Sequence, residues 1–234
     1  MTTEIQIKGF QQDGAVYEVV RDRNNWYLLF KRFFDLGVCL LMLPFITVLI
    51  ALLSIMIMID SPGTPFFIQE RVGKGGRRFR MYKFRTMSND YDDRQDRVFM
   101  QAFVVGQIDG DHTNHASVFK PISKQHITRV GGILRKASLD ELPQIFNILR
   151  GDMSLVGPRP NTLWEVEAYL DWHRERLEVL PGITGLAQVN GRSKITFDKI
   201  ALYDIQYVRN LSLGLDFWIL GQTVWIVLTG KGAG

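Results

Sequence analysis

The sequence predicts an α+β fold that is mostly helical, in which a re-entrant membrane helix, broken in its middle, precedes a cytosolic core. Three features support this fold class. Residues 36–59 form an apolar run without a charged side chain, two apolar segments flank the glycine-rich stretch 73–76, and apolar residues recur at helical spacing through much of the remaining chain. The second feature indicates a small β-hairpin. The third indicates amphipathic helices that lie at the membrane surface around the core.

The composition favours anionic partners. The 234 residues carry a formal net charge of +4 and the isoelectric point is near 9.2, which suits lipid head groups, phosphates or nucleic acid. The N-terminal residues are polar and mixed in charge, so we expect no secretory signal peptide. The single cysteine, Cys39, excludes a disulfide framework within the chain and fits a reducing compartment.

Three regions follow from these patterns. We expect a polar lead-in at 1–30, the membrane helix at 31–60 and a cytosolic domain at 61–234. Within that domain, residues 88–125 are rich in Asp, Asn and Gly and are interpreted as a variable insertion, partly helical near 98–105.

The apolar run is long enough to cross a bilayer. Leu36–Ile59 holds 24 residues (59 − 36 + 1), which is about 36 Å of straight helix against a hydrocarbon core of about 30 Å. Both flanks are basic, whereas a spanning helix collects Lys and Arg on its cytoplasmic flank. Pro44 lies within the run and removes a helical hydrogen bond. We therefore predict a helix that bends at Pro44 and returns to the cytoplasmic face; a kinked spanning helix is the alternative.

A β-hairpin is predicted next. Phe66–Val72 and Arg78–Thr86 flank the turn at 73–76. The alternation of apolar residues slips at Met81 and Tyr82, which indicates a β-bulge. The cations of the hairpin either face lipid phosphates or cover a solvated strand face.

The remaining chain is predicted to be helical, with one loop of special composition. Residues 181–192 hold three glycines and two amides, which suits either a loop whose backbone approaches a ligand or a structural turn. In the last helix Trp218 and Trp225 lie seven apart, so this helix either rests in the membrane interface or packs into the core. The predicted helices occupy 127–134, 142–149, 161–180, 197–210 and 215–228.

Two adjacent carboxylates, Asp140 and Glu141, stand among basic residues. Acids can hold a metal and bases can hold phosphate, so this cluster indicates phosphoryl chemistry at a helix start. The alternative is purely structural: Ser138 and Glu141 match a capping box, and Asp140 is then an ordinary first-turn acid. The surrounding cations are Arg135, Lys136, Arg150 and Arg159.

Six motifs, in order, closely resemble the bacterial sugar transferase family, the monotopic phosphoglycosyl transferases. The resemblance runs from about Phe30 to the C-terminus. In two places the sequence departs from the family pattern: Leu43 precedes Pro44 where members often have Ser, and Leu186 stands where Trp is common. The motifs are Lys31–Asp35, Gln69–Gly73, Tyr82–Met87, Ser138–Gln144, Gly151–Pro160 and Pro181–Arg192.

The resemblance implies roles for individual residues. Asp140 corresponds to the family's nucleophile and Glu141 to its partner, with Mg²⁺ as the cofactor held by this pair. Lys31 and Arg32 correspond to the pair that anchors the re-entrant helix, and Pro44 to its break. Arg159, between Pro158 and Pro160, shapes the nucleotide and phosphate site. We expect further substrate or phosphate contacts from Arg85, Arg135, Arg150, Gln188, Asn190 and Arg192.

The implied reaction moves a sugar 1-phosphate from a nucleotide sugar, usually a UDP-sugar, to polyprenyl (undecaprenyl) phosphate. It passes through an aspartyl-phosphosugar intermediate, releases UMP, and is the first membrane step in assembling exopolysaccharide, O-antigen, capsule or glycoprotein glycans. The implied location is the cytoplasmic face of the bacterial inner membrane, among anionic lipids of the inner leaflet. No nucleic-acid partner is expected, and a homodimer is compatible with the resemblance.

Two other function classes explain less of the sequence. A membrane-anchored basic module that binds nucleic acid or anionic lipid without chemistry would account for the charge and the apolar run, but not for Asp140, Glu141 or the glycine-rich loop. A multi-span sugar-phosphate transferase would need more than one strong apolar segment.

Overall fold

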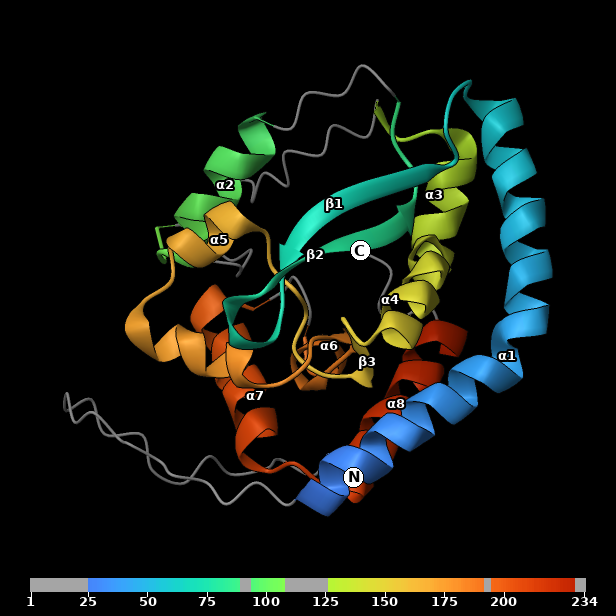
Figure 1. Ribbon diagram of the computed structural model, residues 1–234. Coiled ribbons are helices and arrows are strands. Elements are labelled where there is room, and N and C mark those ends of the chain that lie inside the picture. Colours follow the sequence, from blue (N-terminus) through green and yellow to red (C-terminus); the bar gives the residue numbers. More distant parts are fainter. Residues whose placement is uncertain (1–24, 89–93, 108–125, 192–194, 230–234) are drawn as a thin grey trace.

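The computed structural model describes residues 25–88, 94–107, 126–191 and 195–229. Its described part is mostly helical, with a two-stranded hairpin and a second, very short two-stranded sheet. The lead-in lies outside the described residues, except that the first helix begins before residue 31. The helices and strands lie on one side of the long first helix (Figure 1).

Helix α1 (Asn25–Asp60) is continuous through Pro44 and bends into two limbs (Figure 1). It is the one helix among the described residues that is long and apolar enough to cross a membrane. Cys39, Ile50 and Ile57 pack inward, while most of the other apolar side chains of α1 are exposed. The helix therefore presents a broad apolar surface that no described part of the chain covers, as a lipid-facing helix must. The hydroxyl of Thr47 donates to the Leu43 carbonyl (2.7 Å) next to the bend.

The two ends of α1 are both fastened to the rest of the fold. Near its start, Lys31 forms an ion pair with Asp216 (2.9 Å) and Arg32 donates to two helix-end carbonyls. At its end, the Asp60 carboxylate accepts from the Val130 amide (2.9 Å), and Arg85 donates to the carbonyls of Ser61 and Pro62. The two limbs therefore leave from and return to the same body of protein.

Strands β1 (Phe66–Val72) and β2 (Arg78–Phe84) form the predicted antiparallel hairpin, joined by the one-turn helix η1 (Lys74–Gly76). The register is unbroken along the hairpin, so the predicted bulge at Met81 and Tyr82 is wrong. The alternation of apolar residues shifts by one position because the buried side chains of β2 move from one face of the strand to the other. Phe79 and Met81 pack against one core cluster, whereas Phe84 packs against the second limb of α1.

Three consecutive segments then run beside β2: α3 (Arg129–Lys136), η3 (Leu139–Gln144) and α4 (Ile145–Arg150). Asn147 ties α4 to the edge of β2. Its amide nitrogen donates to the Arg80 carbonyl (2.7 Å), and its amide oxygen accepts from the Tyr82 amide (3.1 Å). A strand edge that would otherwise expose backbone groups is thereby satisfied, and η3 is held next to the end of β2.

The glycines of the 181–192 loop serve the fold. Strand β3 (Ser154–Val156) pairs in parallel with β4 (Gly182–Thr184), a sheet that the periodicity did not predict. A Cβ on Gly157 or Gly182 would collide with the opposing backbone. These glycines permit close backbone approach, which favours the structural reading of this loop over the ligand-binding one.

The single helix predicted over 161–180 is two separate helices, α5 (Leu163–Glu167) and η4 (Asp171–Glu178). The break occurs at Leu170, which is extended, and its amide donates to Nδ1 of the buried His173 (3.1 Å). This side chain caps a new helix start, so the helical pattern could not continue. The other described helices are α2 (Arg94–Val104), α6 (Leu186–Val189), α7 (Phe197–Arg209) and α8 (Leu213–Thr229).

Helix α8 lies with little of its apolar surface against the core. Asp216 and Ile219 are its buried residues, while Trp218, Trp225 and Leu228 are exposed. This pattern favours the interfacial interpretation of the helix over a core position.

Candidate active site

The two predicted acids lie in η3, which opens with a strained residue. Ser138 adopts a left-handed backbone conformation (φ 56°), and its side chain makes no capping hydrogen bond. The capping box that was the structural alternative for Ser138 and Glu141 is therefore wrong, and the Glu141 carboxylate accepts from Lys83 and Arg159. Its side chain serves a contact between distant segments instead.

Glu141 is held by two cations. Nζ of Lys83 and Nη1 of Arg159 each lie 3.0 Å from the same carboxylate oxygen, Oε1. Burial alone would raise the pKa of Glu141, but Arg159 and Lys83 outweigh burial and lower this pKa to about 2. Glu141 is therefore a fixed negative charge that aligns both cations.

Asp140 has a different environment, although it is the next residue. No described residue donates a hydrogen bond to its carboxylate, and burial raises its pKa. Lys83, Arg159 and Arg135 oppose this shift, and the neighbouring Glu141 adds to it. The two carboxylates therefore differ. Glu141 is held by hydrogen bonds from two cations, whereas Asp140 is available to bind a ligand.

Arg135 approaches the pair from α3. Its Nε donates to the hydroxyl of Thr86 (2.8 Å), just beyond β2. The close approach of α3 needs Gly131, since a Cβ there would collide with the backbone of Thr86. Because Gly131 lets α3 pack this closely, Arg135 is the third cation near Asp140, after Lys83 and Arg159.

The loop that carries Arg159 is rigidly held through its carbonyl groups. The Pro158 carbonyl accepts from the Gly182 amide (2.9 Å), the Arg159 carbonyl from Arg176 (3.3 Å) and the Pro160 carbonyl from Arg71 (3.2 Å). Pro158 and Pro160 are buried, whereas the Arg159 side chain is 47% exposed and extends to Glu141. The loop therefore fixes its backbone and offers one guanidinium to solvent.

Comparison with known proteins identifies the family of the chain. Residues 26–230 match the family model described as bacterial sugar transferase. The chain belongs to this family. It is 40% identical over 231 residues to the galactosyl transferase CpsE of Streptococcus agalactiae serotype III (strain NEM316), covering 98% of this chain and 49% of that protein.

Two further relatives show the range of the family. The chain is 38% identical to the UDP-glucose:undecaprenyl-phosphate glucose-1-phosphate transferase of Xanthomonas campestris pv. campestris, covering 91% of this chain and 41% of that one. It is also 38% identical to the uncharacterized sugar transferase EpsL of Bacillus subtilis (strain 168), covering 88% of this chain and 90% of EpsL. The chain thus spans about half the length of several curated relatives and nearly all of EpsL.

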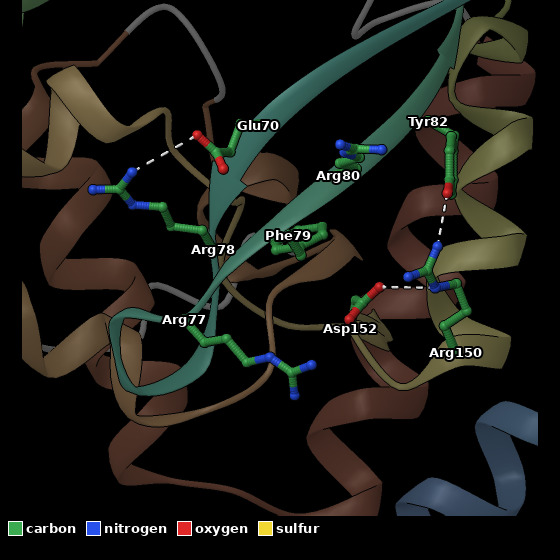
Figure 2. Close-up of a pocket in the computed structure, with 8 residues that line it drawn as sticks. All are labelled: Glu70, Arg77, Arg78, Phe79, Arg80, Tyr82, Arg150 and Asp152. Carbon is green, nitrogen blue, oxygen red and sulfur yellow. Dashed lines mark hydrogen bonds and ion pairs between the residues drawn. The ribbon is translucent and has the colours of Figure 1, made fainter.

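Four of the predicted substrate-contacting residues have partners away from Asp140. Arg85 holds the carbonyls that follow α1, and Gln188 and Asn190 donate to the carbonyls of Ile183 and Leu186 (2.8 Å each). Arg150 donates to the Tyr82 hydroxyl (2.7 Å) in a separate pocket (Figure 2). Arg192 lies outside the described residues. Ligand binding by these residues stays a prediction.

The sequence reasoning missed three basic residues of the site. Lys83 contacts Glu141, and Arg71 and Arg176 hold the loop of Arg159. One local signal pointed to Lys83, because a charged residue stands where the apolar alternation of β2 slips. No local signal identified Arg176, which lies in a helix 17 residues beyond Arg159.

The acidic pair suits a divalent cation whose other ligands come from the substrate and water. Among the described residues no group of three or more His, Cys, Asp or Glu side chains is arranged to hold a metal. Mg²⁺ commonly takes one or two carboxylates together with substrate phosphates and water. From the described residues, neither the Asp140 carboxylate nor Oε2 of Glu141 accepts a hydrogen bond, whereas Oε1 of Glu141 accepts two. The residues present therefore fit Mg²⁺.

Proposed function

We propose that this chain is a sugar-phosphate transferase that moves a sugar 1-phosphate from a UDP-sugar to undecaprenyl phosphate through a covalent bond to Asp140. The observation that carries the proposal is the unequal pair, in which Glu141 is pinned by Lys83 and Arg159 while Asp140 accepts no hydrogen bond from a described residue. The names of the relatives support the substrates. They name galactose, glucose and N-acetylgalactosamine, so the sugar of this chain stays open.

In the first step, a carboxylate oxygen of Asp140 attacks the sugar-bearing phosphorus of the UDP-sugar. The bond from this phosphorus to the bridging oxygen breaks, and UMP leaves with that oxygen. An aspartyl-phosphosugar remains. A carboxylate is a competent nucleophile here because Lys83, Arg135 and Arg159 offset the repulsion between anions.

In the second step, a phosphate oxygen of undecaprenyl phosphate attacks the same phosphorus. The bond to Asp140 breaks, the carboxylate is regenerated, and the product is an undecaprenyl-diphosphate sugar. The acceptor phosphate is already ionised and needs no general base. Mg²⁺ bound by Asp140 and Glu141 would supply further neutralisation of the diphosphate charge.

We further propose that α1 is re-entrant and that the catalytic domain lies on the cytoplasmic face of the bacterial inner membrane. Both ends of α1 are bound to this domain, through Lys31 and Arg32 at one end and Asp60 at the other. The exposed apolar side chains of α1 and α8 support a lipid environment. In this position the enzyme catalyses the first membrane step of glycan assembly.

The two-step scheme makes a prediction that direct transfer lacks. Labelled UMP is expected to exchange into the UDP-sugar in enzyme freed of lipid acceptor, because the first step is reversible on its own. Asp140→Asn is expected to abolish this exchange and overall turnover. The matched control Asp171→Asn, at the exposed start of η4, is expected to keep both. UDP-glucose, UDP-galactose and UDP-N-acetylgalactosamine are the donors to compare first.

Two results would contradict this scheme. One is the absence of exchange in lipid-free enzyme that transfers sugar phosphate when lipid acceptor is added. The other is turnover by Asp140→Asn near the wild-type rate.

A further inference from the structure

A second basic site lies beside the hairpin, and its lining includes none of the residues that contact the acidic pair. Because side chains alternate along a strand, Lys83 of β2 points toward Glu141 while Arg80 and Tyr82 point to the other side. A pocket of about 310 Å³ is lined by Arg80, Tyr82 and the neighbouring Phe79, and Figure 2 shows arginines around the ring of Phe79. This pocket is separate from the cations that surround Asp140.

The lining of the pocket is rich in arginine. Four arginines and two acids line it, which gives a net charge of +2 (4 − 2). Arg77 and Arg80 have no side-chain hydrogen bond or ion pair to any described residue, and the Arg78–Glu70 pair is long (4.0 Å) and more than half exposed. Arg150 donates to Tyr82 (Figure 2) and lies 3.5 Å from Asp152. Guanidinium groups that lack a partner in a concave site suit a phosphate.

The pocket lies next to the membrane helix. Arg150 ends α4, and Arg32 of α1 donates to the carbonyls of the two residues before it, Ile148 (2.7 Å) and Leu149 (3.2 Å). Arg32 precedes the uncharged run of α1, and its neighbour Phe33 is 72% exposed. One wall of the pocket is thereby tied to the charged end of α1, just before the apolar run for which we propose membrane insertion.

We propose that this pocket holds the head group of an anionic phospholipid. This proposal rests on the membrane association in the proposed function, and not on the chemistry at Asp140. The two acids of the lining, Glu70 and Asp152, would repel a nucleotide diphosphate. They can accept hydrogen bonds from the glycerol hydroxyls of a phosphatidylglycerol head group, while Arg77 and Arg80 bind its single phosphodiester charge.

Native mass spectrometry of the full chain in neutral detergent micelles, titrated with phosphatidylglycerol or phosphatidylcholine, tests this site. The double variant Arg77→Gln/Arg80→Gln is expected to bind phosphatidylglycerol roughly 30-fold more weakly, since each basic residue near an anionic lipid surface contributes a factor of about five. The matched control is Arg174→Gln/Lys199→Gln, which removes two exposed charges from η4 and α7, outside the pocket. The control is expected to bind as the wild type does.

Three results would overturn the proposal: phosphatidylglycerol binding unchanged in Arg77→Gln/Arg80→Gln, equal weakening in the control, or equal retention of phosphatidylcholine. A raised KM for the UDP-sugar in the double variant, measured in neutral micelles, would also overturn it, because the pocket would then serve the nucleotide. If the wild type transfers no sugar phosphate yet the lipid difference persists, the head-group site stands and the proposed reaction fails.

Discussion

Asp140 and Glu141 are neighbours in the chain, yet the cations reach them unequally. Glu141 receives two hydrogen bonds from cations, and Asp140 receives long-range attraction from the same groups without a hydrogen bond. A nucleophile must keep a lone pair available, so a fully bonded carboxylate would be a poor one. Lys83 and Arg159 act on both acids, because each bonds to Glu141 and opposes burial at Asp140, where Lys83 is the strongest opposing charge.

Lys83→Gln is expected to move the acidic limb of the kcat/KM profile to higher pH. The pKa of Asp140 is already raised by burial, and loss of Lys83 raises it further. Since only the ionised carboxylate attacks, activity is lost as pH falls through this pKa, and the loss then begins at a higher pH. We expect a shift of about one pH unit and a loss of at least about tenfold in kcat.

Two control variants separate this effect from others. Lys74→Gln, in the exposed hairpin turn, is expected to leave the profile unchanged. In a Glu141→Gln background the limb should still be present and still shift with Lys83→Gln. Two results would assign the acidic limb of the kcat/KM profile to a group other than Asp140. One is an acidic limb that does not shift in Lys83→Gln, and the other is an acidic limb that disappears in Glu141→Gln.

Among the structural elements, the loop of Arg159 depends on a buried ion pair. Arg176 is 2% exposed, donates to the Arg159 carbonyl and to the Tyr169 hydroxyl, and pairs with the equally buried Asp204. Its guanidinium also lies over the rings of Tyr169 and Phe197. Arg176 therefore positions Arg159 through a hydrogen bond to its backbone carbonyl, and not through a contact with Asp140 or Glu141.

Arg176→Met is expected to lower the free energy of unfolding by about 3–5 kcal/mol, because it leaves Asp204 as an unpaired buried charge. The charge-balanced variant Arg176→Met/Asp204→Leu is expected to recover most of this stability. Both variants lose the donor to the Arg159 carbonyl, so we expect the KM for the UDP-sugar to stay several-fold above the wild-type value even in the stable double variant. Thermal unfolding followed by tryptophan fluorescence and steady-state kinetics measure the two effects. A double variant with wild-type stability and wild-type KM would show that Arg176 is purely structural.

For the whole molecule, the decisive feature is that α1 is fastened to one domain at both ends. Asp216 accepts from Tyr27, Lys31 and Tyr207, which joins the first limb to α7 and α8. Asp60 accepts from the first turn of α3, at the positive end of its helix dipole. A straight spanning helix could not make both contacts with a domain on one side of a bilayer.

We therefore predict that both flanks of α1 face the cytoplasm. The test uses single cysteines at Asn24 and Lys74 in a Cys39→Ser background and a thiol reagent that does not cross the membrane. Both cysteines are expected to stay unlabelled in intact cells and to be labelled in permeabilised cells. Cys39 is buried in a core cluster, so the background variant needs a check of folding first. Labelling of the two positions from opposite sides would rule out the re-entrant arrangement.

The sequence alone determined the elements that depend on local pattern. The apolar run, the glycine turn and the helical periodicities correctly predicted α1, the β1–β2 hairpin, α3, α7 and α8, because each is stabilised largely by contacts between residues near in the chain. The adjacent acids and the family motifs predicted a site at Asp140 and Glu141, which stays a prediction, and the structure places Lys83 and Arg159 against Glu141. Local pattern failed where a polar side chain made a contact that apolar spacing does not report. The Leu170 amide donates to the nearby His173, which interrupts the helix predicted over 161–180, and Glu141 bonds to the distant Lys83 and forms no capping box.

Only the tertiary structure decided which cations meet which acids. Lys83 lies 58 residues before Glu141 and Arg159 lies 18 after it, so no periodicity relates these positions. The parallel pairing of β3 with β4 was equally out of reach, since two three-residue strands carry too little pattern of their own. Charges act through space, and the distances that set their strength exist only once the hairpin, η3 and the Arg159 loop have packed together.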